Sequence, residues 1–207
     1  MSRMRAKVCG LTRAEDVAVA RSAGADLIGF VHYPQSPRHC DALTTLAPLA
    51  GSAGVLVMVA EQPDDILQQL RQLPLTRVQP YLPDACRADG VRALQAAGYE
   101  VLLPWPDVPD QAPIPADLYI WETARAQTGV HGGSGQAHAA AHPPPGPHLL
   151  AGGMDADAIA SRVAQLPTEA LKHLAGFDAA SRLESSPGIK DAHRLNQFVS
   201  KVHDYAL

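Results

Sequence analysis

Short apolar runs alternate with amphipathic stretches along most of the chain. The apolar runs lack strict polar alternation, which is typical of parallel strands covered by helices. Eight of them predict strands, at residues 5–8, 27–31, 55–59, 77–79, 100–103, 118–121, 148–150 and 176–178. The amphipathic stretches predict helices at residues 13–23, 40–50, 63–73, 84–97, 155–166 and 192–205. The pattern predicts an α/β fold in which strands and helices take turns.

The stretch between the fifth and sixth predicted strands breaks this rhythm. Residues 104–115 contain five prolines, and a proline inside a helix removes a hydrogen bond and clashes with the preceding turn. The helix expected here is therefore missing or reduced to a loop. Eight strands within 207 residues predict a single (β/α)₈ TIM-barrel domain over residues 1–207.

Composition and charge narrow the class of protein. Charged residues make up 18% of the chain and the formal net charge is −4, with no basic run to contact phosphates, so we expect no nucleic-acid partner. The three cysteines are far apart in the sequence, which favours reduced thiols and a cytoplasmic location. The sequence contains no apolar run of signal-peptide or membrane-spanning length. The expected partner is a small molecule.

The first predicted strand ends in Lys7-Val8-Cys9-Gly10-Leu11-Thr12. Alternate side chains of a strand share a face, so Lys7 and Cys9 point the same way. We expect Lys7 to pair with Asp178, because the first and eighth strands of a closed barrel are neighbours. Thr12 and Glu15 have the spacing of a capping box that begins the next helix. Cys9 is a candidate reactive thiol, because it lies at the carboxyl tip of a strand where such proteins place their chemistry. The alternative is a buried, inert thiol.

This motif, with Gln35-Ser36-Pro37-Arg38 after the second strand, resembles the phosphoribosylanthranilate isomerase family of tryptophan biosynthesis. The resemblance implies that Cys9 is a general base, which requires nearby positive charge to lower its pKa. It also implies that Arg38 binds the anthranilate carboxylate and that Glu122, where the family has aspartate, is the general acid. A surface glutamate and a solvated arginine are the alternatives at positions 122 and 38.

A phosphate site is the next requirement of the resemblance. Glycine-rich loops let backbone N–H groups approach phosphate oxygens, and barrels place such loops after the last strands. The expected phosphate-binding residues are Gly133, Ser134, Gly135, Gly152, Gly153, Ser181 and Arg182. The loop after the eighth strand departs from the family, with Ala180 for a serine and Arg182 for a glycine. Arg182 either binds the phosphate by charge or obstructs the backbone cradle.

Two further departures concern charge near the ligand. The family's histidine after the fourth strand is Tyr81 here, and its lysine after the glycine-rich loop is Gln136. Tyr81 still forms hydrogen bonds, but it carries no positive charge at neutral pH. Lys7 and Tyr81 complete the expected substrate-binding set.

The function implied by the resemblance is the Amadori rearrangement of N-(5'-phosphoribosyl)anthranilate, without metal or cofactor, by a monomer or homodimer that binds neither nucleic acid nor membrane. Two alternatives stay open. One is a barrel enzyme that acts on another phosphosugar, as the departures at Tyr81, Gln136 and Arg182 suggest. The other is a non-catalytic phosphosugar-binding protein. Retention of Cys9 and of an acid at position 122 argues against the second.

Overall fold

Eight parallel strands close into a barrel in the computed structural model of the chain, which describes residues 3–122 and 140–206. Each strand pairs with its sequence neighbours, and β1 pairs with β8 to close the ring. The strands are β1 (Arg5–Cys9), β2 (Leu27–His32), β3 (Gly54–Val59), β4 (Arg77–Tyr81), β5 (Glu100–Pro106), β6 (Leu118–Glu122), β7 (His148–Leu150) and β8 (Leu174–Ala179). The predicted (β/α)₈ barrel is confirmed.

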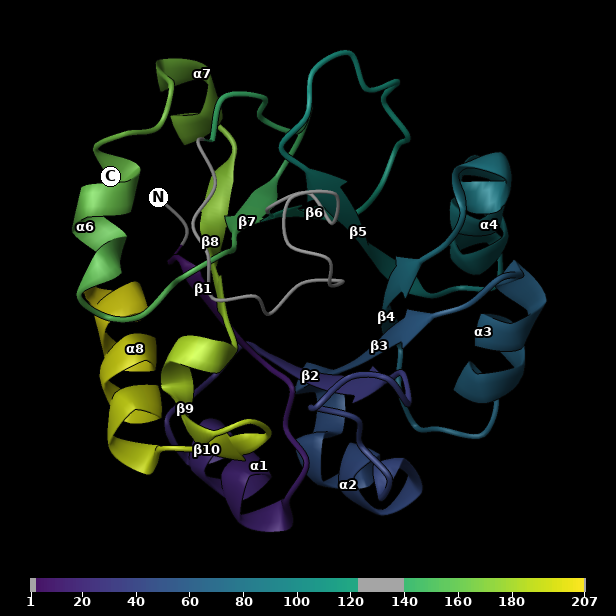
Figure 1. The fold of residues 1–207 in the computed structure, drawn as a ribbon, viewed down its shortest axis with the longest axis horizontal. Helices are drawn as coiled ribbons and strands as arrows, with labels where there is room; N and C mark the ends of the chain where they lie inside the picture. The colour runs from purple at the N-terminus through teal and green to yellow at the C-terminus, as the bar shows by residue number, and fades with distance from the viewer. Residues whose placement is uncertain (1–2, 123–139, 207) are drawn as a thin grey trace.

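Helices surround the barrel and connect its strands (Figure 1). They are α1 (Ala14–Ser22), α2 (Leu43–Ala50), α3 (Pro63–Leu70), α4 (Asp84–Ala96), α6 (Ala158–Val163), α7 (Thr168–Leu171) and α8 (Ala192–Asp204). Short 3₁₀ turns, η1 (Gly51–Ala53) and η2 (Ser181–Leu183), precede β3 and follow β8. A small antiparallel hairpin of β9 (Glu184–Ser186) and β10 (Ile189–Lys190) lies between β8 and α8.

No helix connects β5 to β6, although every residue of that connection, 107–117, is described. Figure 1 shows it as a bare loop beyond the barrel wall. The predicted loss of this helix is confirmed, and its physical reason is the density of prolines, which cannot donate the backbone hydrogen bonds of a helix.

Four predictions about helix ends are wrong. The helix predicted at 63–73 ends at Leu70. Arg13, not Thr12, occupies the N-cap position of α1, and it makes no side-chain cap, because the Thr12 hydroxyl donates to the Gly188 carbonyl instead (2.6 Å). The helix predicted at 40–50 begins at Leu43, because Cys40 N–H donates to Val31 O and extends the β2 edge. The helix predicted at 155–166 is confined to α6, and α7 begins separately after Pro167.

Two apolar cores result from the alternation of side chains along each strand. The larger core lies between the barrel wall and the helices and includes outward-facing residues such as Val8 and Trp121. The smaller core fills the barrel interior and includes Leu27, Val57, Leu118 and Leu149. Polar side chains replace this inner core toward the carboxyl ends of the strands.

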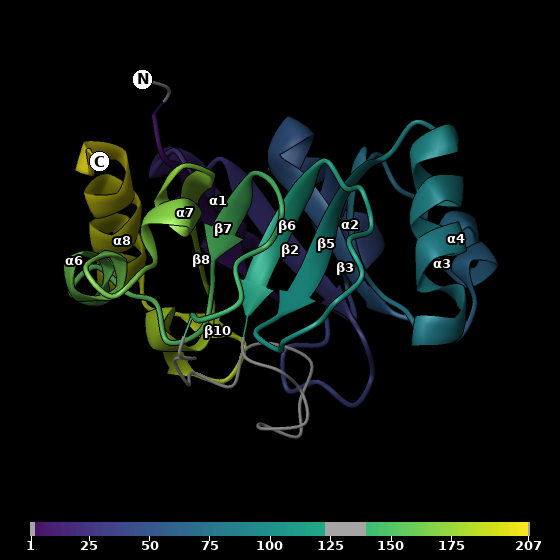
Figure 2. The same cartoon turned by 90° about the horizontal axis from the view of Figure 1, so that it is seen from above.

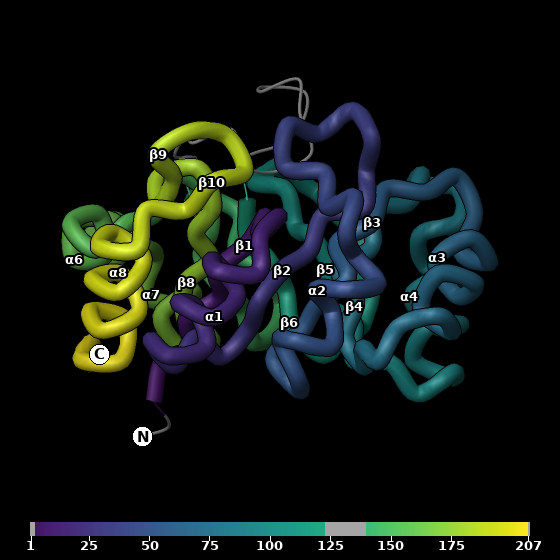
Figure 3. Tube along the Cα trace, turned by 90° about the horizontal axis from the view of Figure 1, so that it is seen from below, coloured from purple at the N-terminus to yellow at the C-terminus, as the bar shows by residue number. Residues whose placement is uncertain are grey.

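The carboxyl ends of the strands form one edge of the barrel, toward which β5 and β6 point in Figure 2. The β9–β10 hairpin and the loop after β2 both rise from this edge, whereas the two termini lie at the opposite edge (Figure 3). Enzymes with this fold carry their chemistry at the carboxyl edge. None of the described helices is long and apolar enough to cross a membrane.

Candidate active site

Six polar side chains project into the barrel interior from four strands. Alternation along each strand places them inward, while their neighbours Ala6, Val78, Trp121 and Phe177 belong to the outer core. The six are Lys7 and Cys9 on β1, Gln79 and Tyr81 on β4, Glu122 on β6 and Asp178 on β8. All but Tyr81 are buried residues. A polar set of this kind inside an otherwise apolar barrel marks the candidate active site.

Lys7 and Asp178 form a buried ion pair beneath this site. The two residues are in register between β1 and β8, and Lys7 Nζ donates to Asp178 Oδ1 over 3.0 Å. Burial by itself lowers the pKa of Lys7, but the neighbouring Asp178 and Cys9 raise it above its ordinary value. Lys7 therefore stays charged, and the predicted pair is confirmed.

Cys9 lies beside this pair and is 9% exposed. Lys7 and Lys190 lower the pKa of the thiol, but burial is the largest influence and raises the pKa above its ordinary value. The nearby positive charge that the general-base role requires is therefore present, but it does not bring the pKa of Cys9 below its ordinary value. The sulfur also depends on Gly29 of β2, because a Cβ at position 29 would lie 2.8 Å from Cys9 Sγ.

Glu122 faces the same interior from β6 and is linked to β4 by hydrogen bonds. Tyr81 Oη donates to Glu122 Oε2 over 2.9 Å, and Gln79 Nε2 donates to Tyr81 Oη over 3.0 Å. Burial raises the pKa of Glu122 to about 8, and the Tyr81 hydrogen bond opposes that rise. Burial and the adjacent Glu122 raise the pKa of Tyr81 well above its usual range. At neutral pH, Glu122 therefore holds a proton and is able to donate it.

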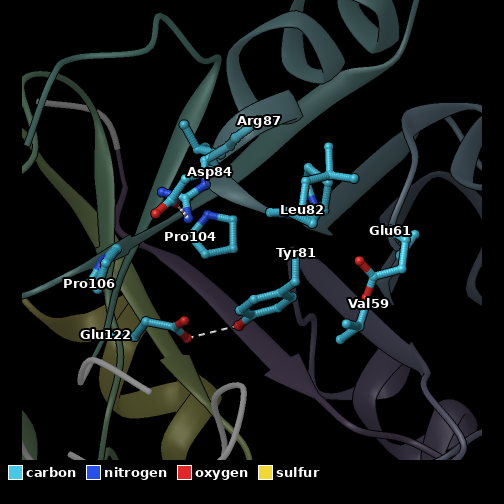
Figure 4. Close-up of a pocket in the computed structure, with 13 residues that line it drawn as sticks. Val59, Glu61, Tyr81, Leu82, Asp84, Arg87, Pro104, Pro106 and Glu122 are labelled. Atoms are coloured by element: carbon cyan, nitrogen blue, oxygen red, sulfur yellow. Dashed lines mark hydrogen bonds and ion pairs between the residues drawn. The ribbon is translucent and has the colours of Figure 1, made fainter. Parts of the chain in front are cut away.

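A cavity of about 370 Å³ opens beside Glu122 and Tyr81, between the ends of β3, β4 and β5. Figure 4 shows the two side chains pointing toward one another at one end of the lining. The remaining lining is mostly apolar, and Glu61, Asp84 and Arg87 are its charged members. The acid is thus accessible from a space of the size that small-molecule sites have.

Arg38, the predicted carboxylate ligand, is held by a glutamate that the sequence analysis missed. Its Nε and Nη2 donate to the two carboxylate oxygens of Glu184, each over 2.8 Å. Lys190 Nζ donates to the same carboxylate over 2.8 Å. Burial raises the pKa of Glu184, but Arg38 and Lys190 hold it below its ordinary value. The available signal was that Glu184 and Lys190 are charged residues in the loop after β8, opposite the loop that carries Arg38.

The guanidinium of Arg38 keeps one edge available. Its Nε and Nη2 bind Glu184, whereas its Nη1 donates to no side chain or carbonyl among the described residues. Its side chain packs so closely over Gly10 that a Cβ there would lie 2.7 Å from Arg38 Cδ. The arginine is therefore fixed in place at the carboxyl edge of β1 and β2.

The structure describes only some of the predicted phosphate residues. Gly133, Ser134 and Gly135 lie outside the described residues, as does Gln136. Gly152 and Gly153 follow β7 with φ of 84° and 67°, a left-handed conformation that favours glycine. Ser181 and Arg182 begin η2, which is separated from β8 by Ala180.

Arg182 connects the two loops at this end of the barrel. Its Nη1 lies 3.8 Å from Asp155 Oδ2, and its side chain is 56% exposed. The structure thus brings the loop after β7 next to Arg182, whose side chain is mostly exposed.

A barrel with a protonated carboxyl group and a thiol facing one interior, above a lysine–aspartate pair, is built for acid–base catalysis on a small molecule. No family model matches the chain. It is 32% identical to the N-(5'-phosphoribosyl)anthranilate isomerase of Pseudomonas paraeruginosa, with 98% of this chain and 96% of that protein covered. The protein of the same name from Leptothrix cholodnii is also 32% identical, with 98% and 92% covered.

Solved structures agree with these relatives. The phosphoribosyl anthranilate isomerase of Thermus thermophilus superposes with a TM-score of 0.78 at 25% identity, covering 96% of this chain and 98% of that one. TrpF from Jonesia denitrificans superposes with a TM-score of 0.76 at 28% identity, covering 96% of each. This chain belongs to the phosphoribosylanthranilate isomerase family, as the sequence resemblance implied.

Proposed function

We propose that this chain isomerises N-(5'-phosphoribosyl)anthranilate to 1-(2-carboxyphenylamino)-1-deoxyribulose 5-phosphate, an Amadori rearrangement of tryptophan biosynthesis. The observation that carries the proposal is the placement of Cys9 and Glu122 in one barrel interior, in a member of this family. An aminosugar needs a proton donor to open its ring and a base to move the double bond. The site contains a candidate for each role.

Glu122 acts first, as the general acid. Its carboxyl group is protonated at neutral pH because burial raises its pKa to about 8. It donates this proton to the ring oxygen while the bond between that oxygen and C1' breaks. The products of the step are an open-chain cationic Schiff base and the Glu122 carboxylate, which remains next to the Tyr81 hydroxyl. An acid whose pKa lies near the working pH suits this step.

Cys9 acts second, as the general base, and it does so as a thiolate. Burial keeps the thiol protonated in the resting site, although Lys7 and Lys190 oppose this. The positive charge of the Schiff base lowers the pKa of the thiol when substrate is bound, and the thiol then releases its proton to solvent. The thiolate removes the proton from C2', and the electrons of that bond neutralise the nitrogen to give an enolamine. Protonation at C1' and loss of the hydroxyl proton at C2' then give the ketone.

The remaining site residues bind the two charged ends of the substrate. Arg38 presents Nη1 to the anthranilate carboxylate, with its other nitrogens held by Glu184. Gly133, Ser134, Gly135, Gly152, Gly153, Ser181 and Arg182 bind the phosphate. Arg182 contributes charge at the rim of that site, because its guanidinium is exposed and lies next to the loop after β7.

We further propose that residues 1–207 act as one domain, as a monomer or homodimer in the cytoplasm, without metal or cofactor. The acid and the base each contribute about 10²- to 10⁴-fold, and orientation of the substrate adds to this.

The test is fluorescence-monitored turnover of freshly generated N-(5'-phosphoribosyl)anthranilate. We expect Cys9→Ala and Glu122→Ala to slow turnover by at least ~100-fold. Cys40→Ala is the matched control, because Cys40 is also buried but belongs to the outer core. An inert wild-type protein that still binds a phosphosugar would instead support the non-catalytic alternative. Turnover of a different phosphosugar alone would support the other enzyme.

A further inference from the structure

Tyr81 and Glu122 come from strands that are not neighbours. β5 lies between β4 and β6 in the barrel wall, and its residues at this level include Pro104 and Pro106, which pair with Ile120 and Glu122 of β6. Proline side chains are short and carry no polar group. The phenol of Tyr81 is therefore able to extend past β5 and reach the carboxyl group, as Figure 4 shows.

The direction of these hydrogen bonds is fixed from the β4 side. A phenol has a single proton to donate and accepts at its oxygen. Gln79 Nε2 is a donor only, and it occupies an acceptor position of Tyr81 Oη over 3.0 Å. The phenolic proton is consequently directed to Glu122 Oε2, 2.9 Å away.

We propose that Tyr81 is a positioning residue for the acid, whose hydroxyl, oriented by Gln79, holds Oε2 of Glu122 so that Oε1 carries and delivers the proton. This inference rests on the proposed isomerisation, in which Glu122 protonates the ring oxygen. It assigns Tyr81 to the acid, where the sequence analysis assigned it to the substrate.

The hydrogen bond from Tyr81 to Glu122 orients the acid, and it also favours transfer of the proton from it. Once Oε1 has given up its proton, Glu122 is a carboxylate, and a hydrogen bond to a charged acceptor is stronger than one to a neutral acid. Tyr81 thus stabilises the state that forms during the reaction more than the starting state, which is the condition for faster chemistry. Loss of the hydroxyl should lower kcat and leave KM nearly unchanged.

The pH dependence is set by the groups that face Glu122. These are Tyr81 from β4, Asp178 from β8 and Lys7 from β1, while Glu61, Asp84 and Arg87 line the adjoining cavity. Burial and Asp178 raise the pKa of Glu122, and Tyr81 and Lys7 lower it. Removing the Tyr81 hydroxyl takes away an influence that lowers this pKa, so the loss of activity at alkaline pH should move to higher pH.

The experiment compares Tyr81→Phe with Tyr119→Phe. Tyr119 is a suitable control because it is buried and donates its hydroxyl to Ile114 O (2.8 Å), but it packs in the outer core. Two measurements are made: kcat and KM against pH, and titration of the Glu122 carboxyl by infrared difference spectroscopy, with its band assigned by Glu122→Gln. Gln79→Leu is a second variant, which keeps the phenol but removes the group that orients it.

We expect Tyr81→Phe to lower kcat by about 10- to 100-fold, the range for a hydrogen bond to a charged group, with KM within about twofold. Its infrared and kinetic transitions should move to higher pH, and Gln79→Leu should show a smaller effect in the same direction. A Tyr81→Phe protein that titrates and turns over like Tyr119→Phe would overturn the inference.

The infrared titration needs no substrate, so the two proposals fail separately. A wild-type protein without turnover, whose Glu122 still titrates higher in Tyr81→Phe, would refute the isomerisation and retain the hydrogen-bond assignment. Normal wild-type turnover with an unmoved Glu122 titration would do the reverse.

Discussion

Glu122 and Glu184 lie at the same edge of the barrel and are each 8% exposed, yet the pKa values of their carboxyl groups shift in opposite directions. Glu122 accepts from a neutral phenol, and burial raises its pKa to about 8. Glu184 accepts from the Arg38 guanidinium and the Lys190 ammonium, which hold its pKa below the ordinary value. Equal solvent exposure thus accompanies an acid in one place and an anion in the other, because the Glu122 carboxyl is more deeply enclosed and accepts from a neutral donor, whereas Glu184 accepts from two cations.

The opposite pKa shifts give the two glutamates different roles. The Glu184 cluster, formed with Arg38 and Lys190, joins the loop after β2 to the β9–β10 hairpin, so its charge fixes the position of Arg38. Glu122 carries no fixed charge and is available to transfer a proton. Loss of Glu184 should therefore mainly lower stability at neutral pH, and loss of Glu122 should mainly lower activity.

Removal of Glu184 should have the largest effect on stability. Glu184→Ala leaves the buried Lys190 and the half-buried Arg38 without a counter-ion, and loss of one partner of a buried pair costs about 3–5 kcal/mol. The measurement is urea unfolding at pH 7. The control is Glu169→Ala, which breaks an exposed pair with Lys172 and should leave the unfolding midpoint unchanged. A Glu184→Ala protein as stable as this control would contradict the structural role of the cluster.

The pH dependence of stability should distinguish the two residues by sign. The pKa of Glu122 is higher in the folded protein, about 8, than in the unfolded chain, about 4.3. Between these values the folded state binds the extra proton, so Glu122 makes stability fall as pH rises, by up to about 1.4 kcal/mol per pH unit. Glu122→Gln removes this slope, so the stability of the variant relative to the wild type should increase from pH 5 to pH 8.

Glu184 should give the opposite slope. Its folded pKa lies below the unfolded one, so its stabilising contribution is present above the unfolded pKa and is lost as pH falls through the folded value. Urea unfolding of wild type, Glu122→Gln and Glu184→Gln from pH 4 to pH 8 measures both slopes. Slopes of the same sign for the two glutamates would invalidate the comparison.

Features that depend on strand order and local chemistry were predictable from the sequence. Alternation along β1 and closure of the barrel were enough to predict the Lys7–Asp178 pair, and proline density was enough to predict the missing helix between β5 and β6. The capping box at Thr12 failed because a tertiary contact with Gly188 competes for its hydroxyl. Local propensity does not contain that contact.

The contacts that set the protonation of the two glutamates were beyond such reasoning. Arg38 and Glu184 are 146 positions apart, and their pairing depends on how two loops fold over the barrel edge. The bond from Tyr81 to Glu122 depends on the reach of a side chain past β5. For Cys9, the sequence indicated the nearby charge of Lys7, but it did not show that burial outweighs this charge.

A smaller effect should show whether turnover depends on the exact position of the Cys9 sulfur inside the barrel. Gly29→Ala adds a methyl group 2.8 Å from Cys9 Sγ, and Gly54→Ala adds one 2.4 Å from Leu75 Cδ2, away from the site. Overpacking costs about 1–3 kcal/mol in either case, so unfolding in urea should show similar losses of stability. Only Gly29→Ala should also lower turnover, by about tenfold, because a displaced sulfur is misaligned with the C2' proton that it removes. Equal turnover in the two variants would mean that the position of the sulfur is not critical, and that Cys9 is the wrong base.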